Sequence, residues 1–213
     1  MHGGGSGGRL WMRAVGGLLL AGAAAQASGA TVQVAVQDGG GRPLAAAVVF
    51  LESAEARKLV RPAQGVEMAQ EKRQFVPDVM VIPVGTEVRF PNRDTVRHHV
   101  YSFSPAKKFE LKLYAGTPAN PVLFDQPGVV VLGCNIHDQM VAWLLVVDTP
   151  FYAQTSAAAP VARLDKVPAG AYRLRVWHAG LPVGAPAHDQ ALSVTESPAP
   201  AAPLVVKLQG VAQ

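Results

Sequence analysis

The stretch "PGVVVLGCNIHDQM", residues 127–140, joins an apolar run typical of a β-strand to a short polar loop. The loop holds the single cysteine of the chain, Cys134, with His137 three residues later and Met140 three residues after that. A thiolate, an imidazole and a weak axial thioether are ligands that trigonal copper sites combine with a second histidine. The loop therefore predicts three ligands of a copper centre and requires one histidine from elsewhere.

Two other interpretations of Cys134 stay open from the residues alone. A cysteine in an apolar strand is commonly a buried hydrophobic side chain with no metal. A zinc site is the other alternative, although zinc does not favour thioether sulfur and structural zinc sites usually have four cysteine or histidine ligands. If Cys134 is only a buried side chain, His137 and Met140 are neighbours of it without a shared role.

The second histidine has few candidates. His2 lies in the leader described below, and we expect His178, on a strand, and His188, in a loop, to be surface or packed side chains. This leaves His98 and His99, in "FPNRDTVRHHVYSF" at residues 90–103. Adjacent side chains of a strand point to opposite faces, so only one of the two can face the metal.

Strand-like runs continue on both sides of the loop. Between Phe75 and Val147 they are "VMVIPV", "TEVRFPN", "HHVYSF", "FELKLY", "PVLFD", "GVVVLGC" and "MVAWLLVVD", separated by turns rich in Gly, Pro and Asn. No segment shows a convincing helical stripe, and residues 56–66 are expected to be a connection. Short strands at this spacing predict an all-β fold, a sandwich or a Greek-key barrel.

Composition agrees with an exported β-rich protein. The chain has 213 residues, enough for one large or two small domains, of which 49% are hydrophobic and 16% charged. The formal charge of +4 includes Arg9 and Arg13, while residues 1–30 contain no acidic residue, so the rest of the chain is near +2. The basic residues are scattered, which argues against a nucleic-acid partner.

Residues 1–30 have the pattern of a cleavable signal peptide. Arg9 and Arg13 precede the apolar run "AVGGLLLAGAAA", and small residues follow at "AQA" (25–27) and "SGA" (28–30). A membrane anchor is the alternative, but the run is shorter than the roughly 20 apolar residues of a stable span. We expect a periplasmic protein with no transmembrane segment in the mature chain. A lone thiol there has no internal disulfide partner, so burial, another chain or a metal must occupy it.

The stretch 75–147 resembles the cupredoxins of the plastocyanin, pseudoazurin and amicyanin group. Three pieces carry the resemblance in order: "FVPDVMVIPVGTEVRFPN", then "NRDTVRHHV", then "PGVVVLGCNIHDQM" with the short Cys-x2-His-x2-Met spacing of amicyanin. The resemblance implies a Greek-key β-sandwich holding one copper ion. Asn135 and Ile136 stand where the family commonly has Thr-Pro between the cysteine and the histidine, a departure that bears on the reduction potential and the docking surface.

The resemblance also assigns the ligands. It implies that His98, Cys134, His137 and Met140 bind copper, with His99 where the family has asparagine after its first histidine. His99 would then lie in the outer shell of the site and fix the ligand loop by a hydrogen bond near Cys134 or Asn135. Asn92, at the start of the second piece, is placed in the same outer shell.

The segments on either side carry a looser resemblance. "VQVAVQDGGGRPLAAAVVFLE" and "LDKVPAGAYRLRVWHAGL" are similar to the early and late parts of transthyretin-like or carboxypeptidase-regulatory-like sandwich domains. We expect a signal peptide (1–30), a flanking sandwich formed by residues 31–60 and 151–208, and a copper domain (66–149) inserted between its halves. The alternative is a cupredoxin whose extra strands pack on its own sheet.

The function that these expectations favour is one-electron transport by a type 1 copper protein, with no enzymatic activity. The resemblance implies a redox partner such as a dehydrogenase or a c-type cytochrome, and proteins built in this way are often labelled methylamine utilization proteins, although nothing in the sequence selects methylamine. Copper storage without electron transfer, or an exported β-sandwich binding module, are the alternatives. An enzyme is the third, since a centre without Met140 would have an open coordination position.

Overall fold

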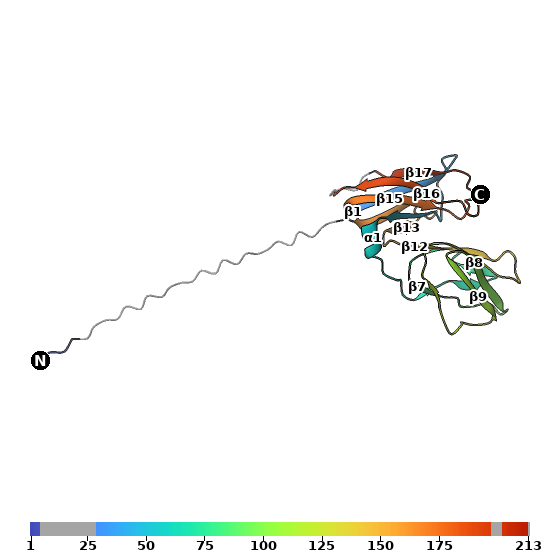
Figure 1. Cartoon of the computed structure of the whole chain (residues 1–213), viewed down its shortest axis with the longest axis horizontal. Helices are drawn as coiled ribbons and strands as arrows, with labels where there is room; N and C mark the ends of the chain where they lie inside the picture. Colours follow the sequence, from blue (N-terminus) through green and yellow to red (C-terminus); the bar gives the residue numbers. More distant parts are fainter. Residues whose placement is uncertain (5–28, 197–201, 213) are drawn as a thin grey trace.

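The all-β prediction is confirmed. The computed structural model describes residues 1–4, 29–196 and 202–212, and in these ranges the chain forms several β-sheets and one short helix (Figure 1). The predicted signal peptide falls mainly on residues 5–28, outside the described residues. Within the described part of the chain, no helix has the length and apolar character needed to cross a membrane.

Two sheets built from the beginning and the end of the described chain face each other. One has the order β14-β1-β17, with β14 (Val161–Val167), β1 (Ala30–Asp38) and β17 (Leu204–Leu208). The other has the order β13-β2-β15-β16, with β13 (Tyr152–Gln154), β2 (Val48–Glu52), β15 (Gly170–Trp177) and β16 (His188–Val194). We call this pair the flanking sandwich.

Alternation in the sequence explains the core of the flanking sandwich. Every second residue of β1 is buried, including Val32, Val34 and Val36. These valines pack against Leu51 and Leu174 of the facing sheet. Each fully buried side chain of this kind contributes roughly 1.5–3 kcal/mol to stability. Two histidine expectations need correction. His178 follows the end of β15 rather than lying on a strand, and His188 is the first residue of strand β16 rather than part of a loop.

The intervening residues form a second pair of sheets, the central sandwich. Its larger sheet has the order β6-β12-β11-β8-β9, with β6 (Val79–Pro83), β12 (Val141–Val147), β11 (Gly128–Gly133), β8 (His98–Ser104) and β9 (Lys107–Tyr114). The smaller has the order β10-β7-β3, with β10 (Val122–Phe124), β7 (Thr86–Arg89) and β3 (Val66–Glu67). A hairpin of β4 (Ala69–Glu71) and β5 (Gln74–Val76) lies beside them.

Strand β12 explains how the two sandwiches meet. Leu144 and Val146 face the core of the central sandwich, while Leu145 and Val147 belong to a separate cluster with Trp177 of the flanking sandwich. A strand with both faces covered is expected to be apolar throughout, as "VAWLLVV" is. Figure 1 shows β12 between the lobe that contains β15 and the lobe that contains β8 and β9.

One helical turn lies in the connection between the sandwiches. Helix α1 (Ala54–Lys58) is capped at its N-terminus by Ser53, whose hydroxyl accepts a hydrogen bond from the Ala56 amide at 3.0 Å. The sequence predicts only a connection at 56–66, because five residues are too few to show a helical period. The helix does not change the fold class.

The topology brings the quoted loop and the two candidate histidines to one end of the central sandwich. Strands β11 and β12 pair antiparallel from Gly128↔Val146 to Gly133↔Val141, so residues 134–140 form the connection at the end of this hairpin. Strand β8 begins at His98 and pairs with β11 through Tyr101↔Gly133. The beginning of β8 therefore lies beside the end of β11.

Candidate metal centre

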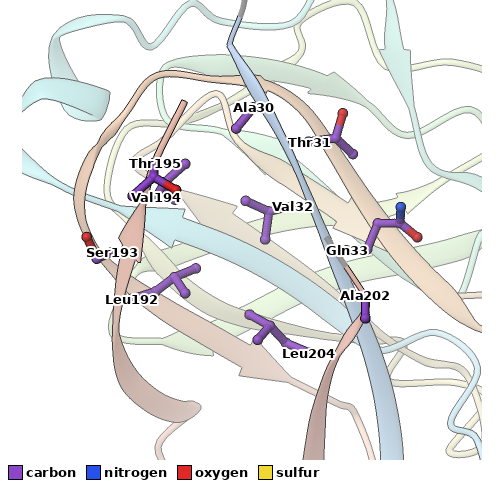
Figure 2. A pocket seen from close by; sticks show the side chains of 10 residues that line it. All are labelled: Ala30, Thr31, Val32, Gln33, Leu192, Ser193, Val194, Thr195, Ala202 and Leu204. Carbon is purple, nitrogen blue, oxygen red and sulfur yellow. The ribbon is translucent and has the colours of Figure 1, made fainter. Parts of the chain in front are cut away.

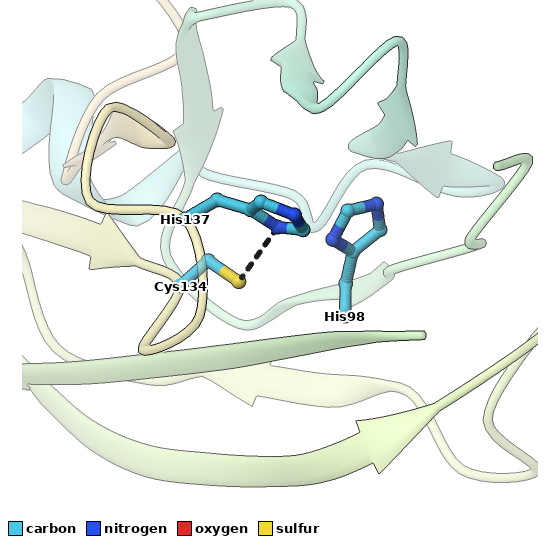
Figure 3. Close-up of side chains that lie close together, drawn as sticks. All are labelled: His98, Cys134 and His137. Atoms are coloured by element: carbon cyan, nitrogen blue, oxygen red, sulfur yellow. Dashed lines mark hydrogen bonds between the residues drawn. The ribbon is translucent and has the colours of Figure 1, made fainter. Parts of the chain in front are cut away.

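His98, Cys134 and His137 converge at this end of the central sandwich. One possible ligand atom from each lies within 4.8 Å of the other two. The rings of His98 and His137 are 5.0 Å apart between centroids, and Nδ1 of His137 is 3.9 Å from Sγ of Cys134. Figure 3 shows the two rings side by side with the sulfur directed toward them. With bonds of about 2.0–2.3 Å to nitrogen and sulfur, ligand atoms around one ion lie roughly 3.5 Å apart. A small shift of the three side chains would therefore bring their ligand atoms to this spacing.

The three side chains differ in burial. His98 is fully buried, Cys134 is 3% exposed, and His137 is half-buried in the loop. Cys134 belongs to the apolar core cluster of the central sandwich together with Leu132 and Val100. The site is thus walled by apolar side chains on the side of the sheet and reaches the surface through His137.

Asp94 fixes the ring of His98. Its Oδ2 lies 2.7 Å from Nε2 of His98 and accepts a hydrogen bond when that nitrogen is protonated. The other ring nitrogen, Nδ1, is then the unprotonated atom, and it is buried without a hydrogen-bond partner among the described residues. A buried nitrogen of this kind is costly unless something binds its lone pair. A metal ion shared with Cys134 and His137 would satisfy it.

The carboxylate of Asp94 has two further partners. It accepts hydrogen bonds from the backbone amides of Lys72 at 2.6 Å and Arg73 at 2.9 Å. Burial works to raise the pKa of Asp94, but the Arg73 amide, the His98 ring and the Lys72 amide outweigh it and hold the pKa below its ordinary value. Asp94 is therefore a carboxylate that orients a ligand histidine, an arrangement common around metal ions.

Asn92 organises the segment that precedes His98. Its side-chain amide donates to the carbonyls of Val96 at 2.8 Å and Tyr114 at 2.9 Å, and its Oδ1 accepts from the amide of Asp94 at 2.9 Å. These bonds fold residues 92–96 into a compact loop that delivers Asp94 to His98. The outer-shell role of Asn92 stays a prediction.

Tyr114 lies near Cys134 on the side of the candidate site that faces the core. Its hydroxyl donates to the carbonyl of Phe90 at 2.7 Å and accepts from the side-chain amide of Gln70. Burial raises the pKa of Tyr114 to about 12, the Gln70 hydrogen bond opposes the rise, and the nearby Cys134 sulfur adds to it. The phenol therefore stays protonated close to the thiol.

Met140 ends the loop in the same buried cluster as Cys134. It is 1% exposed, and its backbone amide donates to the carbonyl of His137 at 2.9 Å, which closes the second turn of the loop. Its role as a copper ligand stays a prediction. Asn135, also expected near the site, is exposed in the first turn of the loop.

The expected hydrogen bond from His99 to Cys134 or Asn135 is wrong. Nε2 of His99 lies 3.1 Å from a carboxylate oxygen of Glu110 and is not aligned for a hydrogen bond, while its ring stands edge-on to Tyr101 at 5.8 Å. His99 and Tyr101 are two residues apart on β8, and alternate residues of a strand share a face. The contacts of the His99 side chain are therefore with Glu110 and Tyr101 rather than with Cys134 or Asn135.

Gly133 has a steric role that the sequence analysis did not assign. A Cβ built there would lie 2.8 Å from the ring of Tyr101, which covers the backbone next to Cys134. Asp94 was missed as well. Its only signal in the sequence is a position four residues before His98, in a loop where that spacing has no fixed meaning.

The donor set fits copper. One thiolate and two imidazoles combine soft and intermediate ligands, which suit Cu(I) and Cu(II) respectively. A pocket elsewhere in the described chain offers no comparable chemistry. This cavity of about 200 Å³ lies between β1 and β16 and is lined by neutral side chains alone, among them Thr31, Gln33 and Leu192 (Figure 2).

Comparisons with known proteins found structural neighbours only. No protein-family profile and no curated protein matches the chain. Solved structures that resemble part of it include a copper-containing nitrite reductase from Thermus scotoductus SA-01, with 26% identity, 41% of this chain, 22% of that chain and a TM-score of 0.36. A purple cupredoxin from Nitrosopumilus maritimus matches with 22% identity over 38% of this chain and 99% of its own, at a TM-score of 0.34.

A point mutant of amicyanin in its Cu(I) form also matches, with 18% identity over 46% of this chain and 98% of its own, at a TM-score of 0.36. The neighbours are thus copper proteins that resemble less than half of this chain, and the chain spans about a fifth of the nitrite reductase. The case for a metal rests on the donor set and on the unpartnered nitrogen of His98.

Proposed function

We propose that the protein binds one copper ion through His98, Cys134 and His137, with Met140 as a weaker fourth ligand, and carries single electrons. The observation that carries the proposal is the buried Nδ1 of His98, which has no hydrogen-bond partner in the described chain and lies in one cluster with a thiol and a second imidazole. Copper bound there would alternate between Cu(I) and Cu(II), which supplies the one-electron chemistry.

Asp94 and the β11–β12 hairpin hold the proposed ligands in place. Asp94 holds the ring of His98 in one orientation and one tautomer, so that Nδ1 is ready without rearrangement. The β11–β12 hairpin fixes both ends of the loop that carries Cys134 and His137. A donor set held by paired strands changes little between two oxidation states, and this favours fast electron transfer.

His137 is the side chain through which a partner would approach. It is half-buried, whereas His98 and Cys134 are enclosed. Ile136, the residue before it in the chain, is 46% exposed. We propose a redox protein as the partner, such as a dehydrogenase or a c-type cytochrome, and the periplasm as the compartment, following the leader pattern of residues 1–30.

A carrier is favoured over an enzyme. A site with Met140 as fourth ligand has no open position for a substrate, and the described residues contain one group of three possible His, Cys, Asp or Glu ligands. We also propose that the central sandwich is a domain inserted into the flanking sandwich, since both flanking sheets combine strands from before and after it.

Electron self-exchange separates a carrier from a copper store. Proton NMR lines of the Cu(I) protein are recorded while the Cu(II) form is added in small amounts. A carrier is expected to show broadening that increases with the amount of Cu(II) protein. Lines that remain sharp while copper stays bound would indicate storage, and failure to bind copper would reject both functions.

A further inference from the structure

A basic turn is hydrogen-bonded to Asp94, the carboxylate that contacts the predicted ligand His98. Strands β4 and β5 pair through Glu71↔Gln74, so Lys72 and Arg73 form a two-residue turn. Both residues are exposed, and both have positive φ, 53° and 58°. Turns of this type normally contain asparagine and glycine, because other residues pay a steric penalty in the left-handed region.

Asp94 holds this turn in place. Its carboxylate accepts both backbone amides of the turn and also contacts Nε2 of His98. The negative charge of Asp94 is therefore directed at the backbone and the histidine ring. The side chains of Lys72 and Arg73 are left to extend into solvent.

The side chains of the two cations have no acidic partner among the residues that the structure describes. Neither Lys72 nor Arg73 takes part in an ion pair there, whereas Arg93 nearby is paired with Glu67 at 3.2 Å. Together with Asp94, Thr95 and Val96 the two cations line a pocket of about 280 Å³. Arg97, directly after this lining, is exposed as well.

We propose that the turn formed by Lys72 and Arg73 is a docking site for the acidic surface of a protein redox partner. Unpaired cations beside a redox centre attract an acidic surface over a distance and orient it on contact. The positive φ values of Lys72 and Arg73 are energetically unfavourable. A function for the two side chains at this position, beside Asp94 and His98, explains why the chain has them there. This inference rests on the proposed function, because it names the partner of the same centre.

A protein surface fits better than a membrane. Attraction to anionic lipid usually needs clusters of about four to eight basic residues, and this site offers two on the turn and Arg97 beside it. The pocket is also lined by Thr95, whose hydroxyl can donate a hydrogen bond to a carboxylate of the partner.

The test uses the metal-free protein, so that it does not depend on copper. A hexaglutamate peptide is titrated into the isotope-labelled protein, and backbone amide shifts are followed by NMR at low and high salt. The expected result is a saturable shift at the amides of Lys72, Arg73 and Thr95 that weakens with salt. In a K72Q/R73Q variant the affinity for the peptide should fall by about tenfold or more.

A matched variant and a second probe complete the design. K166Q/K207Q removes two exposed lysines of the flanking sandwich and should leave the affinity for the peptide unchanged. Shifts that are absent from the turn, or that persist in K72Q/R73Q, would overturn the proposal. The proposal would also be overturned if the protein binds phosphatidylglycerol vesicles, loses this binding in K72Q/R73Q, and does not bind the peptide. Failure of the copper function appears instead in the spectrum of the loaded protein, so the two failures are distinguishable.

Discussion

At the scale of single residues, the candidate centre depends on three side chains that one loop and one strand bring together. Cys134 and His137 were predicted from spacing inside one loop, and the structure places them together with His98. Close spacing in the sequence predicts closeness in space here, because the side chains of a short loop cannot lie far apart. Asp94 was not predicted, because it contacts His98 from a loop, where a spacing of four residues has no fixed structural meaning.

We expect D94N to weaken copper binding about tenfold to a hundredfold, the usual cost of losing an outer-shell partner. An asparagine presents one acceptor oxygen where Asp94 serves two backbone amides and His98, so at least one of these bonds is lost. The measurement is the Cu(I) affinity by competition with a chelator. D138N, an exposed position inside the loop, is the control. Equal affinities for both variants would show that Asp94 does not position His98.

Replacing Met140 with leucine is expected to leave copper bound but to change its colour and its reduction potential. The swap nearly conserves volume, so the cost to stability should stay below about 1.5 kcal/mol. Visible absorption and voltammetry of the loaded variant give the answer. An unchanged spectrum and potential would mean that Met140 packs in the core without binding the metal.

At the scale of elements, strands were predicted better than turns. The runs around "VMVIPV", "HHVYSF" and "MVAWLLVVD" correspond to β6, β8 and β12, because buried apolar residues mark them clearly. The β4–β5 hairpin was not singled out as an element. Its strands have three residues each, and its turn carries Lys72 and Arg73 where a hairpin normally signals itself with asparagine and glycine.

The variant K72N/R73G is expected to raise the free energy of unfolding by about 1–2 kcal/mol, since it removes the left-handed penalty at two positions. Backbone amides remain available to Asp94, so copper should still bind. Urea denaturation of the metal-free protein measures the change. No gain in stability would mean that the turn relaxes at little cost. The same variant should lose affinity for the hexaglutamate peptide, because it lacks both cations.

At the scale of the whole molecule, the two sandwiches share an apolar interface. Trp177 of the flanking sandwich packs in one cluster with Leu145 and Val147 of β12. The sequence predicted both sandwiches as β-rich segments, yet the contact between them could not be read from it. Alternation shows that a strand has a covered face, but not which partner covers it.

We expect W177A to destabilise the protein by about 3–5 kcal/mol, the usual cost of removing a large buried aromatic side chain. The loss should affect both sandwiches, because Trp177 contacts each of them through the shared cluster. Thermal unfolding followed by circular dichroism measures it, with the exposed V205A as the control. If W177A unfolds like V205A, the interface does not couple the two parts.

The central claim is a copper ion bound by the thiolate of Cys134. The most direct test is the visible absorption and EPR spectrum of the protein loaded with Cu(II), recorded beside the C134S variant. An intense sulfur-to-copper charge-transfer band that is lost in C134S is the result that the site predicts. A colourless protein, or weak Cu(II) binding that is the same in both forms, would contradict it and leave Cys134 as a buried structural thiol.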